Sequence, residues 1–350
     1  MKSTDISRLR LFNQHLASQR FNKAAEIINY LGAVQAQDYA GAKWAVGMRL
    51  QKSKDSAIDK ALTDGSIIRT HVLRPTWHFV TPADARWMIE LSAPRIARQA
   101  AGRHRQLKLD SRIFKISNDA LAKELDGNRQ LSRTDMAAVL HKAGIDINEE
   151  RFSHILMQAE LDKVICSGGR QGNQFTYALF DDRVPQYPSL PHNDAVKELV
   201  KRYFISRGPA TVQDFTWWSG LTVTDAKAGI EANRDRLTEV ILNGVRYWVN
   251  KDRQQTIGRA PLAYLLPAYD EFAVAYSDRN VAINKKYKEQ TKYIIFAPAV
   301  LIDGKVAGTW RRTLKGKALE VDLNIFGKLN PAHNKAVDRA VERYKKFIGR

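Results

Sequence analysis

The chain has little cysteine and no long apolar run, and both absences exclude classes of protein. Cys166 is the only cysteine among 350 residues, which excludes an internal disulfide and a cysteine-based zinc site. No run of about 18 apolar residues occurs, which excludes a membrane-spanning helix. The opening residues MKSTDISRLRLFNQ contain no continuous apolar region, so we expect no signal peptide. These absences predict a reduced, cytoplasmic protein with no membrane partner.

Motifs for cofactor chemistry are also missing. The 8 histidines include no HExxH or HxH spacing, and no glycine-rich phosphate-binding loop occurs. We therefore expect neither a metal nor another cofactor.

Acidic residues are scarce relative to basic ones. The chain has 37 Asp and Glu against 56 Lys and Arg, which gives a formal charge of +19. Basic residues are concentrated at 86–115 and again from Gly304 onward, where 12 Lys and Arg face 4 Asp and Glu. The excess favours a polyanionic partner, either nucleic acid or an acidic membrane surface, over an inert basic surface.

Helical apolar spacing followed by a pair of strands occurs three times. The first copy has helical spacing near 6–16 and 24–31 and a short helix at 56–62, and then IIRTHVLRPTWHFVTP has the composition of a hairpin. The second has polar caps at Ser117, Ser132 and Asn148, followed by the strand pair VICSGGRQGNQFTYALF. The third ends on LTEVILNGVRYWVN, two strands around Asn243-Gly244. Three helices before a hairpin are typical of the winged helix.

After about residue 253 the pattern changes to short strands. Turns at Asp303-Gly304 and Lys315-Gly316 indicate a small barrel or sheet, and NKAVDRAVERYKKFI predicts a last helix. The predicted fold class is α+β, with three tandem winged-helix motifs followed by a C-terminal β-barrel-like domain. The predicted domains are residues 1–115 (winged helix 1 with a long basic helix), 116–188 (winged helix 2), 189–252 (winged helix 3) and 253–350 (β-barrel or sheet with the terminal helix).

Four stretches carry a resemblance to a known family: LGAVQAQ (31–37), IIRTHVLRPTWHFVTPAD (67–84), LLPAYDEFAVAYSDRN (265–280) and LIDGKVAGTWRR (301–312). Through them, nearly the whole chain resembles the winged-helix DNA-binding family of the AlkZ- and YcaQ-type bacterial DNA glycosylases. The resemblance implies three winged helices, a β-barrel and a concave DNA-binding surface. It also implies a monofunctional DNA glycosylase that excises N-alkylated purines from double-stranded DNA and unhooks interstrand crosslinks. Where relatives have an Arg-Gly-Thr turn, this chain has Arg74-Pro75-Thr76.

Gln35 and Gln37 match the catalytic pair that the resemblance implies. That pair is Gln-x-Gln in the AlkZ-type branch and Gln-x-Asp in the YcaQ-type branch, so this chain follows the first. Paired amides suffice where the leaving base is already cationic, because a glutamine can position water and stabilise positive charge without titrating. The alternative is that both glutamines merely cap the end of the preceding helix and bind water.

Other basic and polar residues are candidate DNA contacts. Arg69 and Arg74 flank the first hairpin as expected phosphate contacts, Arg170 lies at the tip of a predicted wing, and His78 either orients a phosphate or is structural. The full predicted set is Lys43, Arg69, Arg74, Thr76, His78, Arg170, Arg279, Arg311 and Arg312.

Two further pairs have both a functional and a structural interpretation. Asp270 and Glu271 could hold a metal or act as a base, but we expect them to pair with one of the arginines 279, 311 and 312. Trp217 and Trp218 could insert into DNA, but two tryptophans in a helix usually belong to the core.

Two rival functions have the same sequence features. One is a non-enzymatic winged-helix regulator or scaffold that binds DNA, and the other is a scaffold that binds RNA or an anionic surface. The chain has no evident dimerisation helix, so we expect a monomer without an obligate protein partner. We expect a cytoplasmic location at the nucleoid.

Overall fold

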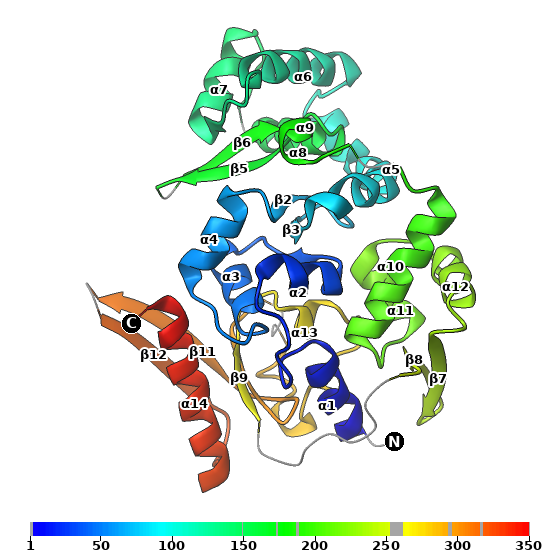
Figure 1. Ribbon diagram of the computed structural model, residues 1–350, viewed down its shortest axis with the longest axis vertical. Coiled ribbons are helices and arrows are strands. Elements are labelled where there is room, and N and C mark those ends of the chain that lie inside the picture. Colours follow the sequence, from blue (N-terminus) through cyan, green and yellow to red (C-terminus); the bar gives the residue numbers. More distant parts are fainter. Residues whose placement is uncertain are drawn as a thin grey trace. The chain divides into compact units, whose positions relative to one another are not determined.

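Helices and antiparallel strand pairs follow one another along the chain, which gives a mixed α+β architecture (Figure 1). The computed structural model describes residues 3–148, 150–172, 174–186, 189–252, 262–292, 296–315 and 318–349. The chain divides into two compact units. The larger unit comprises Met1–Ile58, Val196–Trp218 and Thr222–Arg350, and the smaller unit comprises Asp59–Ala195 and Ser219–Leu221.

The larger unit begins with three helices and a short strand: α1 (Ser3–Asn13), α2 (Ala24–Leu31), β1 (Val34–Gln35) and α3 (Tyr39–Gly47). Sequence spacing predicted α1 and α2 but not α3. Every residue from Gly41 to Gly47 is buried, so α3 has no polar face to produce a helical period. Asp38 starts this helix, because its carboxylate accepts a hydrogen bond from the Gly41 N–H.

The predicted first hairpin is present in the smaller unit. It follows helix α4 (Asp55–Thr63) and a turn at Gly65, where φ is 79°. Strands β2 (Ile68–His71) and β3 (Trp77–Val80) pair antiparallel, with Arg69 opposite Phe79 and Thr70 opposite His78. The predicted basic helix is α5 (Pro82–Gln106), and Pro82 occupies its first turn.

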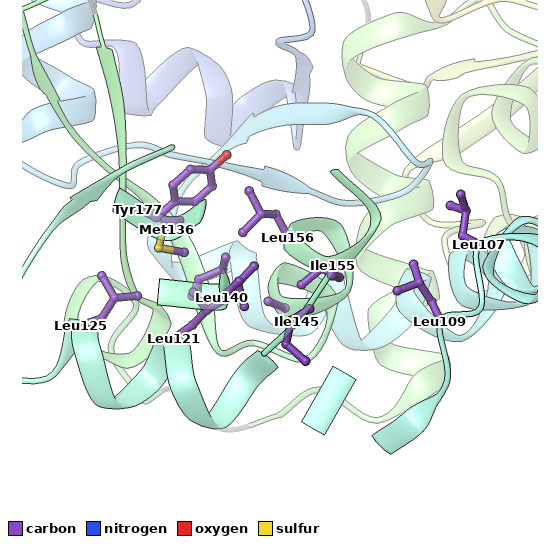
Figure 2. Close-up of a cluster of buried hydrophobic side chains, with 12 residues drawn as sticks. Leu107, Leu109, Leu121, Leu125, Met136, Leu140, Ile145, Ile155, Leu156 and Tyr177 are labelled. Carbon is purple, nitrogen blue, oxygen red and sulfur yellow. The ribbon is translucent and has the colours of Figure 1, made fainter. Parts of the chain in front are cut away.

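In the rest of the smaller unit, most elements pack on an apolar core (Figure 2). Its elements are α6 (Ser111–Leu125), β4 (Leu131–Ser132), α7 (Arg133–Lys142), α8 (Arg151–Leu161), β5 (Ile165–Gln171), β6 (Gln174–Leu179) and α9 (Phe180–Arg183). Leu121 and Leu125 of α6, Met136 and Leu140 of α7 and Ile155 of α8 are each 0% exposed.

One of the three predicted caps in this unit is correct. Ser132 caps α7 through a reciprocal capping box with Asp135. The other two predictions were wrong: Asp110 caps α6, which places Ser117 inside that helix, and Glu150 rather than Asn148 occupies the cap position of α8. The predicted second hairpin corresponds to β5 and β6, and residue 173 of its turn lies outside the described residues.

The third pattern also has three helices before a hairpin. The elements are α10 (His192–Arg207), α11 (Val212–Ser219), α12 (Val223–Glu231), β7 (Leu237–Leu242) and β8 (Val245–Asn250). Asn243 and Gly244 join the strands with φ of 50° and 75°, the positive values of a type I′ turn.

The C-terminal part of the larger unit contains an antiparallel sheet in the order β12-β11-β10-β9. Its elements are β9 (Ala263–Leu266), α13 (Glu271–Val274), the 3₁₀ turn η1 (Lys285–Tyr287), β10 (Ala299–Ile302), β11 (Lys305–Lys315), β12 (Ala318–Ile325) and α14 (Pro331–Ile348). Over the described residues this sheet is open rather than closed into a barrel. The predicted turn at Asp303-Gly304 is present, whereas Gly316 of the other predicted turn lies outside the described residues.

Candidate active site

The two glutamines lie where the chain passes from α2 to α3. Helix α2 ends at Gly32, which adopts a φ of 79° that glycine reaches easily because it has no side chain. The Gly32 N–H donates to Asn29 O and so closes the last turn of the helix. Neither glutamine therefore caps α2. Gln35 lies in β1 and is only 8% exposed, whereas Gln37 is exposed and precedes the cap of α3.

A buried ion pair holds the backbone of this segment. The Gln35 N–H donates to Glu271 Oε1 at 2.9 Å, and Arg207 Nη2 pairs with Glu271 Oε2 at 2.6 Å. Both charged side chains are 0% exposed. Arg207 also donates to Leu31 O at 2.5 Å and to Ala33 O at 2.8 Å. The end of α10 and the start of α13 thus fix the backbone on both sides of Val34.

A second buried pair continues the network. Arg49 forms two hydrogen bonds to Asp270, at 2.8 and 2.9 Å, and a third from Nη2 to Gln14 Oε1 at 2.8 Å. Gln14 donates to the Tyr276 hydroxyl at 2.9 Å, and that hydroxyl donates to Arg207 O at 2.8 Å. Burial raises the pKa of Tyr276 to about 12, so the hydroxyl keeps its proton for this bond.

The expected partners of the acidic pair were therefore wrong. Asp270 and Glu271 do pair with arginines, but with Arg49 and Arg207. A fully buried carboxylate needs a partner that is buried with it, whereas Arg311 and Arg312 are exposed. Sequence spacing gave no sign of Arg207 or Arg49, because each pair joins residues that are far apart in the chain.

The side-chain carbonyl of Gln35 has a different environment from its backbone. Gln35 Oε1 is buried, and no group among the described residues donates a hydrogen bond to it. A buried carbonyl oxygen without a donor costs about 1–3 kcal/mol. Such an atom is suited to accept a hydrogen bond from a water or substrate group that enters the site.

Four of the predicted DNA contacts belong to the larger unit. Lys43 is 5% exposed and its ammonium donates to Asp55 at 2.6 Å, so a phosphate contact would require that pair to open. The Arg311 side chain is 82% exposed and lies 3.3 Å from Asp322 on the neighbouring strand. Arg312 donates to the Tyr344 hydroxyl at 2.9 Å. Arg279 is half-buried beside Trp217.

The other five belong to the smaller unit. Arg69 is 9% exposed, with its guanidinium 4.3 Å from the Trp77 ring centroid and 4.7 Å from that of Phe175. His78 is fully buried, and its Nδ1 lies 2.8 Å from Thr76 O. Arg170 lies 3.5 Å from Asp59.

The turn that carries Arg74, Pro75 and Thr76 accommodates the proline. Arg74 N–H donates to Val72 O, and Thr76 N–H donates to Arg74 O, each at 2.7 Å. These are two successive three-residue turns, centred on Leu73, with φ of 64°, and on Pro75. The fixed φ of proline suits the second turn, so its geometry is compatible with this sequence.

Glu160 of the smaller unit is a further buried acid that sequence reasoning missed. Its Oε2 accepts hydrogen bonds from the His71 N–H at 2.9 Å and from Thr70 Oγ1 at 3.2 Å, and lies 2.6 Å from His71 Nδ1. Trp77 Nε1 donates to Oε1 at 3.3 Å. These contacts fix the first hairpin on α8. The only sequence feature that could have indicated this role is the position of Glu160 among the apolar residues of a predicted helix.

Among the described residues, no group of three or more His, Cys, Asp or Glu is placed to hold a metal ion. In the same residues, no helix is both long enough and apolar enough to cross a membrane.

Comparison with known proteins gives consistent results. A curated relative named interstrand DNA cross-link repair glycosylase, from Streptomyces sahachiroi, is 24% identical over 317 residues, which cover 86% of this chain and 85% of the relative. The solved structure of Streptomyces sahachiroi DNA glycosylase AlkZ has the same fold, with a TM-score of 0.76 at 20% identity, and the match covers 100% of this chain and 97% of that one. The family model described as DNA glycosylase AlkZ-like matches residues 28–347. The chain therefore belongs to the AlkZ-like DNA glycosylase family and is a DNA-repair enzyme that hydrolyses N-glycosyl bonds.

Proposed function

We propose that this glycosylase releases cationic N-alkylated purines from double-stranded DNA, including purines joined in interstrand crosslinks, and that Gln35 and Gln37 carry the chemistry. The observation that supports this best is the buried Gln35 Oε1, which has no donor among the described residues and lies on a backbone held by Glu271 and Arg207. The name of the relative from Streptomyces sahachiroi, interstrand DNA cross-link repair glycosylase, supports the substrate class.

The charge of the lesion explains why no acid is needed. An N7- or N3-alkylated purine carries a positive charge, so the electron pair of the breaking C1′–N bond neutralises the departing base. The base leaves without a proton from the enzyme. What remains is a sugar with oxocarbenium character and a water that must attack C1′.

The two amides suit these remaining tasks. Gln35 Oε1 accepts a hydrogen bond from the water, which points a water lone pair at C1′, and its partial negative charge faces the developing positive charge. Gln37, exposed at the start of α3, holds the water or the sugar from the other side. After attack, the oxygen on C1′ carries both protons of the water and loses one of them to solvent, which leaves a neutral hydroxyl. The enzyme contributes position and electrostatics rather than proton transfer.

DNA binding in this proposal uses the repeated helix–hairpin pattern. The three sets of helices before a hairpin are three winged helices, and the C-terminal sheet is part of a barrel-like domain, with domain boundaries at 115, 188 and 252. The phosphate contacts are the predicted basic residues, of which Arg311 and Arg312 are exposed. An enzyme of this kind acts on genomic DNA, at the nucleoid in the cytoplasm.

The experiment is base release from a duplex with one N7-methylguanine, followed by cleavage of the abasic site. We expect the Gln35→Ala/Gln37→Ala variant to lose release by about 100- to 1,000-fold, the usual cost of removing an electrostatic stabiliser. Its affinity for the duplex should stay near that of the wild type, since neither amide is charged. Gln290→Ala is the matched control, because Gln290 is an exposed glutamine of the same unit.

The outcomes separate the proposal from its rivals. Wild-type protein that binds the duplex but releases no base would mean that N7-methylguanine is not a substrate of this glycosylase, and would contradict the proposed substrate class. Double-variant protein with full turnover would place the chemistry elsewhere. Parallel duplexes with uracil or 8-oxoguanine test the role of charge, since both bases are neutral and should stay attached.

A further inference from the structure

The two adjacent tryptophans of α11 have different environments. Trp218 is 0% exposed and its indole N–H donates to Glu271 Oε2 at 3.0 Å. Trp217 is 48% exposed. The prediction that both belong to the core was therefore wrong for Trp217. Consecutive residues of a helix point about 100° apart, so a helix that buries one can expose the other.

The exposed ring is nevertheless fixed in orientation. Trp217 Nε1 donates to Val274 O at 3.0 Å. Val274 is the last residue of α13, and the first, Glu271, accepts the Gln35 N–H. One short helix therefore fixes both the exposed ring and the backbone of the proposed catalytic glutamine. A rigid aromatic surface loses little conformational entropy when a ligand stacks on it.

A cation lies beside this ring. The Arg279 guanidinium carbon is 5.4 Å from the Trp217 ring centroid. Its Nε donates to Ala273 O at 3.1 Å and its Nη1 to Ser277 O at 3.3 Å. Arg279 Nη2 is buried and has no acceptor among the described residues. Burial also lowers the pKa of this guanidinium, because desolvation disfavours its charged form.

We propose that Trp217 and Arg279 form a platform on which an unpaired nucleobase of the DNA strand stacks. The ring supplies the stacking face, and Arg279 Nη2 donates to a base or phosphate oxygen of the same nucleotide. A nucleobase fits both features, since every base has an aromatic face and hydrogen-bond acceptors beside it. Excision requires the target nucleotide to leave the stack, which exposes unpaired bases near the catalytic segment. The identity of the ligand rests on the proposed function.

The test compares binding of undamaged DNA by the wild type, Trp217→Ala and Trp217→Phe. A fully paired duplex is the comparison probe. The two test probes are one single-stranded oligonucleotide and one duplex with an unpaired base, and fluorescence anisotropy measures binding. We expect Trp217→Ala to weaken both complexes by about 5- to 150-fold, the range of about 1–3 kcal/mol for base–aromatic stacking. Phenylalanine keeps a stacking face but cannot donate to Val274 O, so it should restore most of the affinity. Phe296→Ala is the control, because Phe296 is a 62% exposed aromatic residue of the same unit and lies outside the helix–hairpin pattern.

Each result decides for or against the platform. Unchanged affinity of Trp217→Ala would overturn it, and so would a phenylalanine variant as weak as the alanine one, since the indole hydrogen bond would then be responsible. Weakening of the fully paired duplex to the same extent would indicate a general surface contact and would also overturn it. The binding measurements use undamaged DNA, so they test the platform even if the wild type releases no base from the N7-methylguanine duplex.

Discussion

Gln35 and Gln37 are two positions apart, yet their surroundings differ. Gln35 is buried in β1, and Gln37 is exposed in the bend before α3. Residues two positions apart in an extended segment point to the same face, so the spacing alone indicates that the two amides share one face. It did not predict the difference in burial, which depends on Arg207 and Glu271 from distant parts of the chain. The motif was recognisable from sequence, while the restraint on its backbone was not.

The pH profile of base release follows from the chemistry of an amide. Glutamines do not ionise, so we expect a nearly flat kcat between about pH 6 and 9 on the N7-methylguanine duplex. A proton shuttle through His78 would instead make the rate change sigmoidally with pH. Single-turnover rates across this range distinguish the two. A sigmoidal profile that disappears in His78→Gln would contradict amide catalysis.

The elements around the glutamines come from three distant segments of the chain. The loop after α2 is held by the end of α10 and by α13, which Figure 1 draws in blue, green and yellow. Side-chain periodicity predicted most elements because it depends on neighbours within a few turns. It missed α3, which is buried on all sides, and it gave the wrong partners for Asp270 and Glu271.

The buried ion pair between α10 and α13 should dominate the stability of this arrangement. Arg207→Ala leaves the Glu271 carboxylate buried without its cation, so we expect a loss of about 3–5 kcal/mol in the free energy of unfolding. Urea unfolding followed by circular dichroism measures it. Arg234→Ala is the control, because the Arg234–Glu231 pair has side chains 51% and 74% exposed and should change stability by less than about 1 kcal/mol. Equal effects of the two variants would contradict a bracing role for Arg207.

A histidine pair between α5 and α8 should make the smaller unit sensitive to acid. His104 Nε2 and His154 Nδ1 are 3.2 Å apart, with Arg103 and Glu150 beside them. Burial lowers the pKa of both histidines below the usual 6.5, and the neighbouring imidazole and Arg103 act in the same direction, while Glu150 opposes them at His154. Below about pH 6.5 the unfolded chain therefore binds more protons than the folded one, and stability falls as pH decreases.

The measurement is the urea midpoint at pH 7.5 and at pH 5.5. We expect His104→Phe/His154→Gln to lose less stability on acidification than the wild type. His141→Gln is the control, since His141 is exposed on α7 of the same unit. An identical decrease in the double variant would mean that other groups cause the acid sensitivity.

At the scale of the whole molecule, the family and the α+β class were predictable from sequence, and the family match confirms the first. The grouping of segments was harder to predict. Residues 1–58 belong to one compact unit with residues 196–218 and 222–350, and no local sequence pattern records contacts at that separation. The predicted boundaries at 115, 188 and 252 stay predictions. Net charge, in contrast, follows from the amino-acid composition alone and can be known without the fold.

The formal charge of +19 makes a quantitative prediction about DNA binding. Each phosphate contact by Lys or Arg should contribute about −0.9 to the slope of log K against log salt concentration, through release of counterions. With roughly six to ten contacts, affinity should fall by about 10³–10⁵ between 50 and 200 mM salt. Anisotropy titrations of an undamaged duplex give the slope.

Arg311→Gln should make this slope shallower by about 0.9 if the exposed Arg311 side chain contacts a phosphate. Lys115→Gln, in an exposed pair with Asp119, gives the matched comparison on the basic stretch at 86–115. A slope near zero would mean that the positive charge is only a solvated surface, and that affinity comes from uncharged contacts.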